Sequence, residues 1–225
     1  MFARLKRYTY SNDDSKSVEE DEGPDSDFIR VVGTNIYFSG EVCQESIRDL
    51  NVALMKTQMR LIMTCASVGI DPPGINLYIN STGGCVFSGF SGMDQIRTMK
   101  VPVTTIVDGC CCSAATFLLL GGHKRLMKEN SFVLIHQITN TFWGKFEELK
   151  DEMETTSRLM DHIMNVYRKE TKISEKRLKK FMKRDVYMNS DECIRYGVVS
   201  GVFEGPLSLA LKSLPKDEDE DGDDD

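Results

Sequence analysis

Apolar residues recur along the chain with two different spacings, which predict an alternation of helices and strands. Helical spacing of three and four residues is found in three segments, at residues 42–68, 88–99 and 114–120. Short runs typical of strands lie between and after them, starting at Ile75 and then covering residues 101–107, 125–127 and 132–135. Because helices follow strands in this order, the pattern favours parallel pairing and an α/β architecture.

The longest helical signal covers residues 145–169. Its apolar positions repeat at three- and four-residue steps, at Phe146, Leu149, Met153, Met160, Ile163, Met164 and Tyr167. Such a stripe packs either on the core of its own domain or against another molecule. We expect the second, an assembly contact.

The two ends of the chain are strongly acidic. Residues 12–27 hold eight acidic residues and one lysine, and residues 216–225 hold eight acidic residues and one lysine. Segments of this kind bury too little apolar surface to offset the loss of chain entropy. We therefore expect disordered arms at residues 1–27 and 209–225, which serve solubility or docking, and one domain at residues 28–208 between them.

Composition bounds the class of protein. With 225 residues, of which 40% are hydrophobic, the chain can bury one substantial core. Seven cysteines, a charged start without a following apolar segment and the lack of a membrane-length apolar run favour a reducing, cytoplasmic location. Cys110 to Cys112 are consecutive and cannot all face one ion, so we expect buried cysteines there and no metal or other cofactor.

Ser113 lies among small residues between an expected strand at 103–107 and an expected helix at 114–120. A serine at a helix N-terminus stands where free backbone N–H groups favour developing negative charge. A nucleophile is presented in this way, although small residues at a helix start also fill protein cores. The neighbouring motifs favour the nucleophile.

Histidine and aspartate side chains also follow regular elements. His136 comes directly after an apolar strand, and Asp185 follows a basic helical stretch at residues 174–184. Acyl transfer needs this set, because a histidine takes the serine proton and a carboxylate orients that histidine. His123 and His162 are alternative bases, and we prefer His136 because it alone ends a strand.

The same chemistry needs hydrogen-bond donors for an oxyanion. The N–H of Ala114 directly follows the serine, and the N–H of Gly84 lies in a polar glycine turn where no Cβ blocks approach. Cys112 is an alternative nucleophile. It is the weaker choice, because one step around a helix start turns a side chain by about 100°.

Taken together, these residues resemble the proteolytic subunit of the Clp protease and its viral and organellar relatives. The resemblance covers residues 31–202 and rests on motifs in matching order, at residues 36–42, 80–84, 109–114, 135–137, 183–185 and 196–199. Gly84 precedes Ser113 by 29 residues and Asp185 follows His136 by 49, as in the familiar bacterial enzymes. The resemblance implies a crotonase-like fold of repeated ββα units, with residues 145–169 as a projecting handle helix.

The resemblance also implies a function and a site. It implies a serine endopeptidase with Ser113 as nucleophile, His136 as general base and Asp185 as orienting acid. The backbone of Gly84 and Ala114 would form the oxyanion hole. Further implied substrate contacts come from Gly83, Cys85 and Gln137.

The family resemblance implies partners as well. Its members form heptameric rings, stacked as tetradecamers, which cleave peptides or unfolded proteins supplied by an AAA+ unfoldase. This chain departs from the family at residues 138–144, where a glycine-rich segment is usual, and before residue 36, where the first helix of the family is missing. The N-terminal loops that meet the ATPase therefore have no counterpart to carry over.

Other functions fit parts of the same sequence pattern. A viral relative that trims capsid or scaffold proteins, and a non-catalytic subunit of a mixed ring, share the same fold. An acyl-CoA enzyme of the wider crotonase fold would need no such serine. The basic cluster at residues 172–184 indicates a solvated helix face more than a nucleic-acid site, since no aromatic platform accompanies it.

Overall fold

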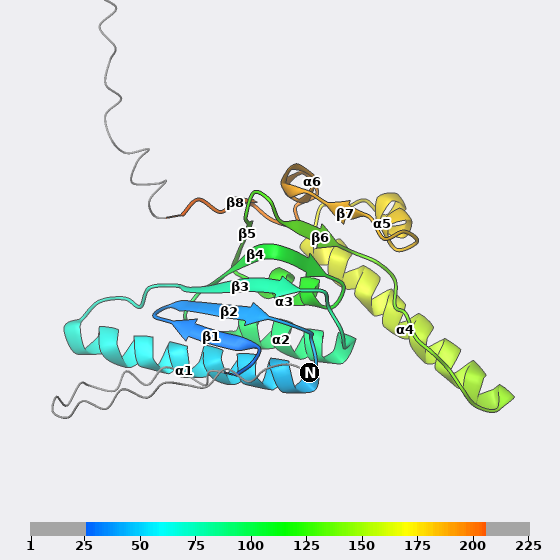
Figure 1. Ribbon diagram of the computed structural model, residues 1–225, viewed down its shortest axis with the longest axis horizontal. Coiled ribbons are helices and arrows are strands. Elements are labelled where there is room, and N and C mark those ends of the chain that lie inside the picture. Colours follow the sequence, from blue (N-terminus) through cyan, green and yellow to red (C-terminus); the bar gives the residue numbers. More distant parts are fainter. Residues whose placement is uncertain (1–25, 206–225) are drawn as a thin grey trace, which may run out of the picture.

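Strands and helices alternate through residues 26–205, the part of the chain that this computed structural model describes (Figure 1). The strands are β1 (Ile29–Val32), β2 (Asn35–Ser39), β3 (Ile75–Ser81), β4 (Val103–Cys112), β5 (Lys124–Met127), β6 (Phe132–Leu134), β7 (Tyr187–Met188) and β8 (Gly201–Val202). The helices are α1 (Gln44–Val68), α2 (Val86–Thr98), α3 (Ala115–Gly121), α4 (Phe146–Glu170), α5 (Glu175–Phe181) and α6 (Ser190–Arg195). The α/β prediction is confirmed. The predicted acidic arms lie almost wholly outside the described residues.

One sheet organises these elements, in the strand order β1-β2-β3-β4-β5-β8. Neighbours from β2 to β8 along this path pair in parallel, whereas β1 and β2 form an antiparallel hairpin around Gly33, which has a φ of 59°. Helices α1 and α2 lie side by side along one face of the sheet (Figure 1). Their buried side chains, such as Leu50, Leu54 and Ile96, meet the inward positions of the strands and form the core.

Strand β4 is longer than predicted and divides its pairing between two neighbours. Residues 104–107 pair with β5, and residues 110–112 pair with β6. Gly109, with a φ of 93°, lies between the two halves. The sequence analysis ended this strand at residue 107, began the next helix at residue 114, and left the cysteines between them outside both elements. The cysteines extend the strand, and the helix begins at Ala115, one residue later than predicted.

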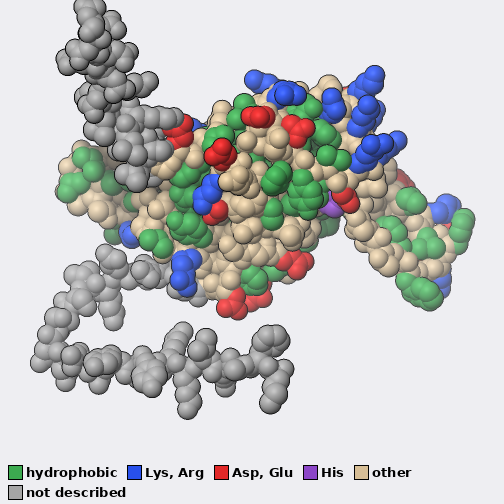
Figure 2. All heavy atoms as spheres, turned by 45° about the horizontal axis from the view of Figure 1, so that its top comes forward, with side chains coloured by type: hydrophobic (Ala, Val, Ile, Leu, Met, Phe, Trp, Pro, Cys, Tyr) green, Lys and Arg blue, Asp and Glu red, His purple; other side chains and the backbone are tan. Residues whose placement is uncertain are grey.

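Helix α4 projects away from the sheet (Figure 1). Its buried residues are Ile163, Met164 and Tyr167, all in the C-terminal half. The N-terminal half exposes apolar side chains, among them Phe146, Leu149 and Met153, and Figure 2 shows hydrophobic groups on this projecting end. The C-terminal part of the predicted stripe therefore packs on the domain's own core. The exposed N-terminal part supports the assembly contact expected from the sequence.

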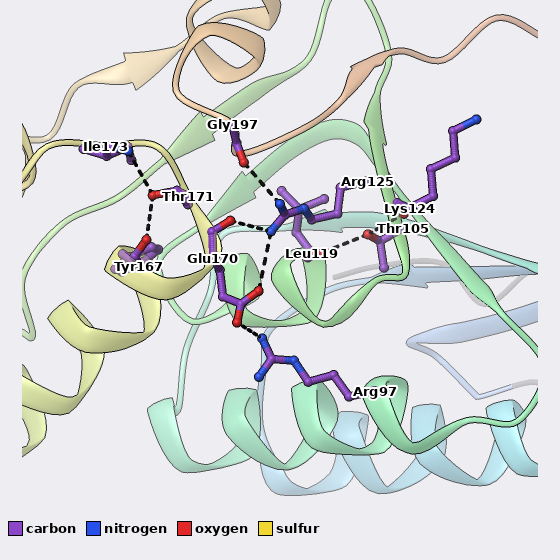
Figure 3. Close-up of polar contacts among 10 residues, drawn as sticks. All are labelled: Arg97, Thr105, Leu119, Lys124, Arg125, Tyr167, Glu170, Thr171, Ile173 and Gly197. Carbon is purple, nitrogen blue, oxygen red and sulfur yellow. Dashed lines mark hydrogen bonds and ion pairs between the residues drawn. The ribbon is translucent and has the colours of Figure 1, made fainter.

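The base of the projecting helix is held by an ionic cluster around Glu170 (Figure 3). Its carboxylate lies 2.7 Å from Arg97 of α2 and 3.9 Å from Arg125 of β5, and its backbone carbonyl accepts a 2.8 Å hydrogen bond from Arg125. Arg125 also donates to the Gly197 carbonyl at 3.2 Å. Burial lowers the pKa of Arg125, and the charge of Glu170 opposes that shift. The cluster therefore joins helices α2 and α4 and strand β5, which are distant in sequence.

We expect Glu170→Gln to lower the free energy of unfolding by about 1 kcal/mol, because two partly exposed arginines lose their counter-charge. Urea unfolding monitored by circular dichroism measures the change. Glu154→Gln is the matched control. It removes an exposed pair with Arg158 on the projecting part of the same helix, so its effect should be below about 0.5 kcal/mol. Equal effects of the two variants would contradict the structural role of the cluster.

Candidate active site

Ser113 follows β4 in a backbone conformation that non-glycine residues rarely adopt. Its φ is 54°, and among residues 26–205 it is the one non-glycine residue with positive φ. The Ser113 N–H donates to the Leu134 carbonyl at 2.8 Å, and the Ser113 carbonyl accepts from the Thr116 N–H at 3.0 Å. Such strain, of order 1–3 kcal/mol, persists only where surrounding contacts enforce it, and it is frequent at active sites.

A buried chain of hydroxyl groups enforces this turn. The Thr116 hydroxyl donates to the Ser113 carbonyl at 2.6 Å and also lies 2.6 Å from the Tyr167 hydroxyl. Because Thr116 uses its proton toward Ser113, Tyr167 must donate to Thr116. Burial raises the pKa of Tyr167 well above its usual range, so this donor keeps its proton. Helix α4 thus supports the Ser113 turn through Thr116.

The glycine turn after β3 packs against Ser113. Gly83 has a φ of 100°, and a Cβ atom there would lie 2.6 Å from the Cys112 carbonyl oxygen and 2.7 Å from the Ser113 Cβ. Gly84 has a φ of 143°, and a Cβ there would meet the Val42 carbonyl oxygen. Only glycine permits this approach. The structure therefore places Gly83 against Ser113, whereas Gly84, next in the same turn, lies against Val42.

Two backbone N–H groups at the junction of the glycine turn with Ser113 have no acceptor among residues 26–205. Neither the Gly84 nor the Ala114 N–H donates to a protein group in that part of the chain. A Cβ on Gly83 would lie 3.2 Å from the Ala114 nitrogen, so the turn and this N–H are close together. These are the two N–H groups that the sequence analysis predicts as oxyanion donors. Unsatisfied backbone donors of this kind are costly unless solvent or a ligand pairs with them.

Strand pairing brings His136 and Asp185 together. Strands β6 and β7 are antiparallel, with Val133 opposite Met188 and Leu134 opposite Tyr187. If that register continues past the strand ends, His136 falls opposite Asp185. The His136 Nδ1 lies 3.3 Å from the Asp185 Oδ1, with 24% of the histidine side chain and 75% of the aspartate side chain exposed. This contact leaves the Nε2 of His136 free to face another group.

Ser113 and His136 line the same small cavity, of about 20 Å³, together with Ala114 and Gln137. No hydrogen bond joins the Ser113 and His136 side chains in the described part of the chain. Catalytic hydrogen bonds are often long before substrate is bound, because closure shortens them. The predicted nucleophile and base therefore line one cavity, and the predicted orienting acid contacts the base.

The alternative bases have other partners. The His123 Nδ1 accepts a hydrogen bond from the Val103 N–H at 3.2 Å, which places this side chain at the start of β4. The His162 ring packs edge-on against Phe90, with centroids 5.1 Å apart. Neither histidine lines the cavity of Ser113. The geometry favours His136 over both.

Comparison with known proteins decides the family. A sequence model of the family described as Clp protease matches residues 49–206, well over half of the chain. The chain belongs to the Clp protease family. The resemblance read from the motifs is confirmed.

Several named Clp protease subunits are similar to this chain. The proteolytic subunit 2 of the ATP-dependent Clp protease from Treponema denticola is 32% identical over 166 residues, 73% of this chain and 82% of the relative. The subunit from Mesostigma viride is 31% identical over 174 residues, 76% of this chain and 72% of the relative. The subunit from Deinococcus radiodurans is 33% identical over 132 residues, and the match spans 58% of this chain and 65% of that relative.

A solved structure confirms the fold of the Clp protease family. A ClpP1 variant from Listeria monocytogenes superposes with a TM-score of 0.67 at 24% identity and covers 79% of this chain and 95% of its own. The prediction of a crotonase-like Clp protease fold with a handle helix is thereby confirmed.

Basic side chains form a separate surface of the molecule around α5. The basic residues expected to form a solvated face lie on and around α5, and Figure 2 shows Lys and Arg gathered at that end of the molecule. Glu175 pairs with Lys179 at 2.7 Å, and hydrogen bonding from Lys179 lowers the pKa of Glu175.

Within residues 26–205, no helix has the length and apolar character needed to span a membrane. No group of three metal-ligating side chains is found there either.

The cysteines near the site differ from one another. Cys111 and Cys112 are buried as expected, and Cys110 is partly exposed. Burial raises the pKa of Cys112 to about 11, so its thiol is a poor nucleophile at neutral pH. Cys85, predicted as a substrate contact, is exposed and directly follows Gly84.

Two residues that support the site were missed by the sequence analysis, Thr116 and Tyr167. The position of Thr116, three residues after Ser113, matches a hydroxyl that can bond back to a carbonyl in the preceding turn. That signal was present but ambiguous. Tyr167 carried no comparable signal, because the sequence placed it only in the apolar stripe of residues 145–169, which was expected to form an assembly contact.

Proposed function

We propose that this protein is a serine endopeptidase that hydrolyses peptide bonds with Ser113, His136 and Asp185. The observation that carries the proposal is the junction of Ser113 with the glycine turn and His136, where a strained serine lies beside unpaired N–H groups. Its membership of the Clp protease family and the names of its relatives support the same activity.

The chemistry assigns one task to each group. The Ser113 Oγ attacks the scissile carbonyl carbon while its proton passes to the His136 Nε2. Asp185 faces Nδ1, holds the imidazole in the required tautomer and stabilises its charged form. The negative charge on the substrate oxygen is stabilised by the N–H groups of Gly84 and Ala114. His136 then protonates the leaving amine, and water releases the acyl group from Ser113.

Gly83, Cys85 and Gln137 remain the proposed substrate contacts. Gln137 is exposed and lines the cavity with Ser113. Residues 138–144 continue from it without regular structure, and the Trp143 side chain is fully exposed. We propose that this segment lies against an extended peptide and sets its preference, which accounts for its departure from the family pattern.

Labelling by a fluorophosphonate tests the proposed activity, because this probe reacts with an activated serine. We expect His136→Ala to slow labelling by about 10²-fold or more, since the general base is lost. His123→Ala and His162→Ala are the controls, and both should label at the wild-type rate. Mass spectrometry locates the adduct and gives the rate. No labelling of the wild type, or equal loss in all three variants, would contradict the assignment.

We further propose that the protein works as a ring-shaped assembly that encloses the active sites and receives unfolded protein from an AAA+ ATPase. The exposed apolar stripe on the projecting half of α4 supports the assembly. Relatives are named as subunits of an ATP-dependent protease, which supports the ATPase partner. Within the rings, substrates would reach Ser113 only after unfolding.

Sedimentation velocity tests the assembly. The wild type should sediment as a species many times the 25.4 kDa mass of the chain. The double variant Leu149→Asp, Met153→Asp places charges on the apolar stripe and should shift most of the protein to smaller species. Ser157→Asp adds a charge at an exposed polar position of the same helix and should leave the large species intact. A wild type that sediments as a monomer at micromolar concentration would overturn the ring proposal.

A further inference from the structure

Two cysteines stand beside each other at the starts of neighbouring helices. Val42 pairs with Gly84 in an isolated parallel bridge, held by the Val42 N–H on the Gly83 carbonyl and the Cys85 N–H on the Val42 carbonyl, both at 2.7 Å. The next residue pair in that register is Cys43 with Cys85. Cys43 is the N-cap of α1, and Cys85 is the N-cap of α2.

The general spacing of paired strands suits a disulfide between the two residues that follow the bridge. Neighbouring strands lie about 4.8 Å apart, and disulfides join Cα atoms about 4.4 to 6.8 Å apart. Both side chains line one apolar cavity of about 780 Å³ between α1 and α2, so they open to the same space. Cys85 is exposed and Cys43 is partly exposed, which lets an oxidant in solution reach them.

The chemistry of the two thiols differs from that of the buried cysteines. Hydrogen bonding from Ser46 lowers the pKa of Cys43, and hydrogen bonding from Ser88 lowers the pKa of Cys85. Burial acts in the other direction elsewhere, since it raises the pKa of Cys111 and of Cys193. Because the thiolate is the reactive form, these opposite shifts favour reaction at Cys43 and Cys85 over Cys111 and Cys193.

We infer that Cys43 and Cys85 form a redox-active pair, a site of reversible modification that closes to a disulfide across the Val42–Gly84 bridge. With glutathione disulfide as oxidant, the Cys85 thiolate attacks one glutathione sulfur and releases the first reduced glutathione. The Cys43 thiolate then attacks the Cys85 sulfur and releases the second. The protein loses two electrons and two thiol protons, and one glutathione disulfide becomes two glutathione molecules.

Such a pair suits a reducing compartment, where disulfides are transient and respond to redox conditions. Closure would lock the starts of α1 and α2 together next to Gly84. It would also withdraw the Cys43 Sγ from its role as acceptor for the Ser46 N–H, now at 3.4 Å. Reduction would restore that cap.

Thiol counting on the full-length protein tests the pair. The protein is equilibrated with mixtures of reduced and oxidised glutathione, quenched with acid and alkylated with N-ethylmaleimide. Intact mass then counts the remaining thiols, and non-reducing peptide mapping locates any cross-link. We expect oxidation of the wild type to remove two alkylated thiols together, with no glutathione retained and a cross-link between Cys43 and Cys85.

Single variants make the test specific. Cys43→Ser should leave Cys85 carrying one glutathione, because the resolving thiol is missing, and Cys85→Ser should abolish the cross-link. Serine can also cap a helix, and thermal unfolding checks that both variants fold. Cys193→Ser removes a buried thiol and should behave as the wild type. The thiol count is independent of peptidase activity, so its failure and that of the proposed function are distinguishable.

Three results would overturn the pair. In the first, wild-type protein keeps glutathione on Cys85. In the second, the cross-link involves other cysteines or joins two chains. In the third, no thiols are lost at any glutathione ratio.

Discussion

Replacement of Ser113 by alanine is expected to lower kcat for peptide hydrolysis by roughly 10⁴-fold or more, because no other group supplies the nucleophile. Fluorophosphonate labelling should disappear with it. The fold should be retained, since the bonds that hold the turn use the backbone of Ser113. Alanine tolerates the positive φ no worse than serine does, so the unfolding midpoint should change little. Cleavage of a fluorogenic peptide and urea unfolding measure the two effects.

Cys112→Ala is the matched control for this experiment. Cys112 precedes Ser113, but its thiol is buried and its pKa is raised to about 11. The variant should therefore keep most of its activity and all of its labelling. If Cys112→Ala were inactive while Ser113→Ala retained hydrolysis, the nucleophile would be the cysteine. If Ser113→Ala lost activity only together with its fold, the serine would have a structural role.

The order of elements could be predicted from periodicity, because helices α1, α2 and α4 carry long apolar repeats. Parallel pairing also followed from this order, but the neighbours of each strand and the antiparallel pairs could not be predicted. The hairpin of β1 with β2 rests on four residues, Ile29–Val32, and a turn at Gly33, and so short a run has no distinct period. The fork in β4 was also missed, because Cys110 to Cys112 suit a strand and a helix start equally well.

The candidate site was predictable where the motif itself carries the chemistry. Ser113, His136 and Asp185 each follow a regular element, so their types and places indicated acyl transfer before any contact was known. Their juxtaposition was not predictable from the elements alone, because it depends on the register of β6 against β7. Tyr167 shows the same limit, since its bond to Thr116 joins residues that are 51 positions apart.

Gly83→Ala is expected to have the second large effect, on both stability and activity. The added Cβ would lie 2.6 Å from the Cys112 carbonyl oxygen and 2.7 Å from the Ser113 Cβ, and backbone atoms cannot rotate away as a long side chain can. Together with the strain of alanine at a φ of 100°, this contact should cost about 2–4 kcal/mol of unfolding free energy. Urea unfolding monitored by circular dichroism measures the loss.

Gly33→Ala separates backbone strain from the contact with Ser113. Gly33 has a φ of 59°, and a Cβ there meets nothing within 4 Å. Alanine at this position should therefore lower the free energy of unfolding by only about 1–2 kcal/mol. Its labelling rate should equal that of the wild type. Gly83→Ala should label much more slowly even under conditions where it is fully folded, because the glycine turn and the Ser113 turn must separate to admit the methyl group. Equal labelling of the two variants would mean that the packing of Gly83 on Ser113 does not position the nucleophile.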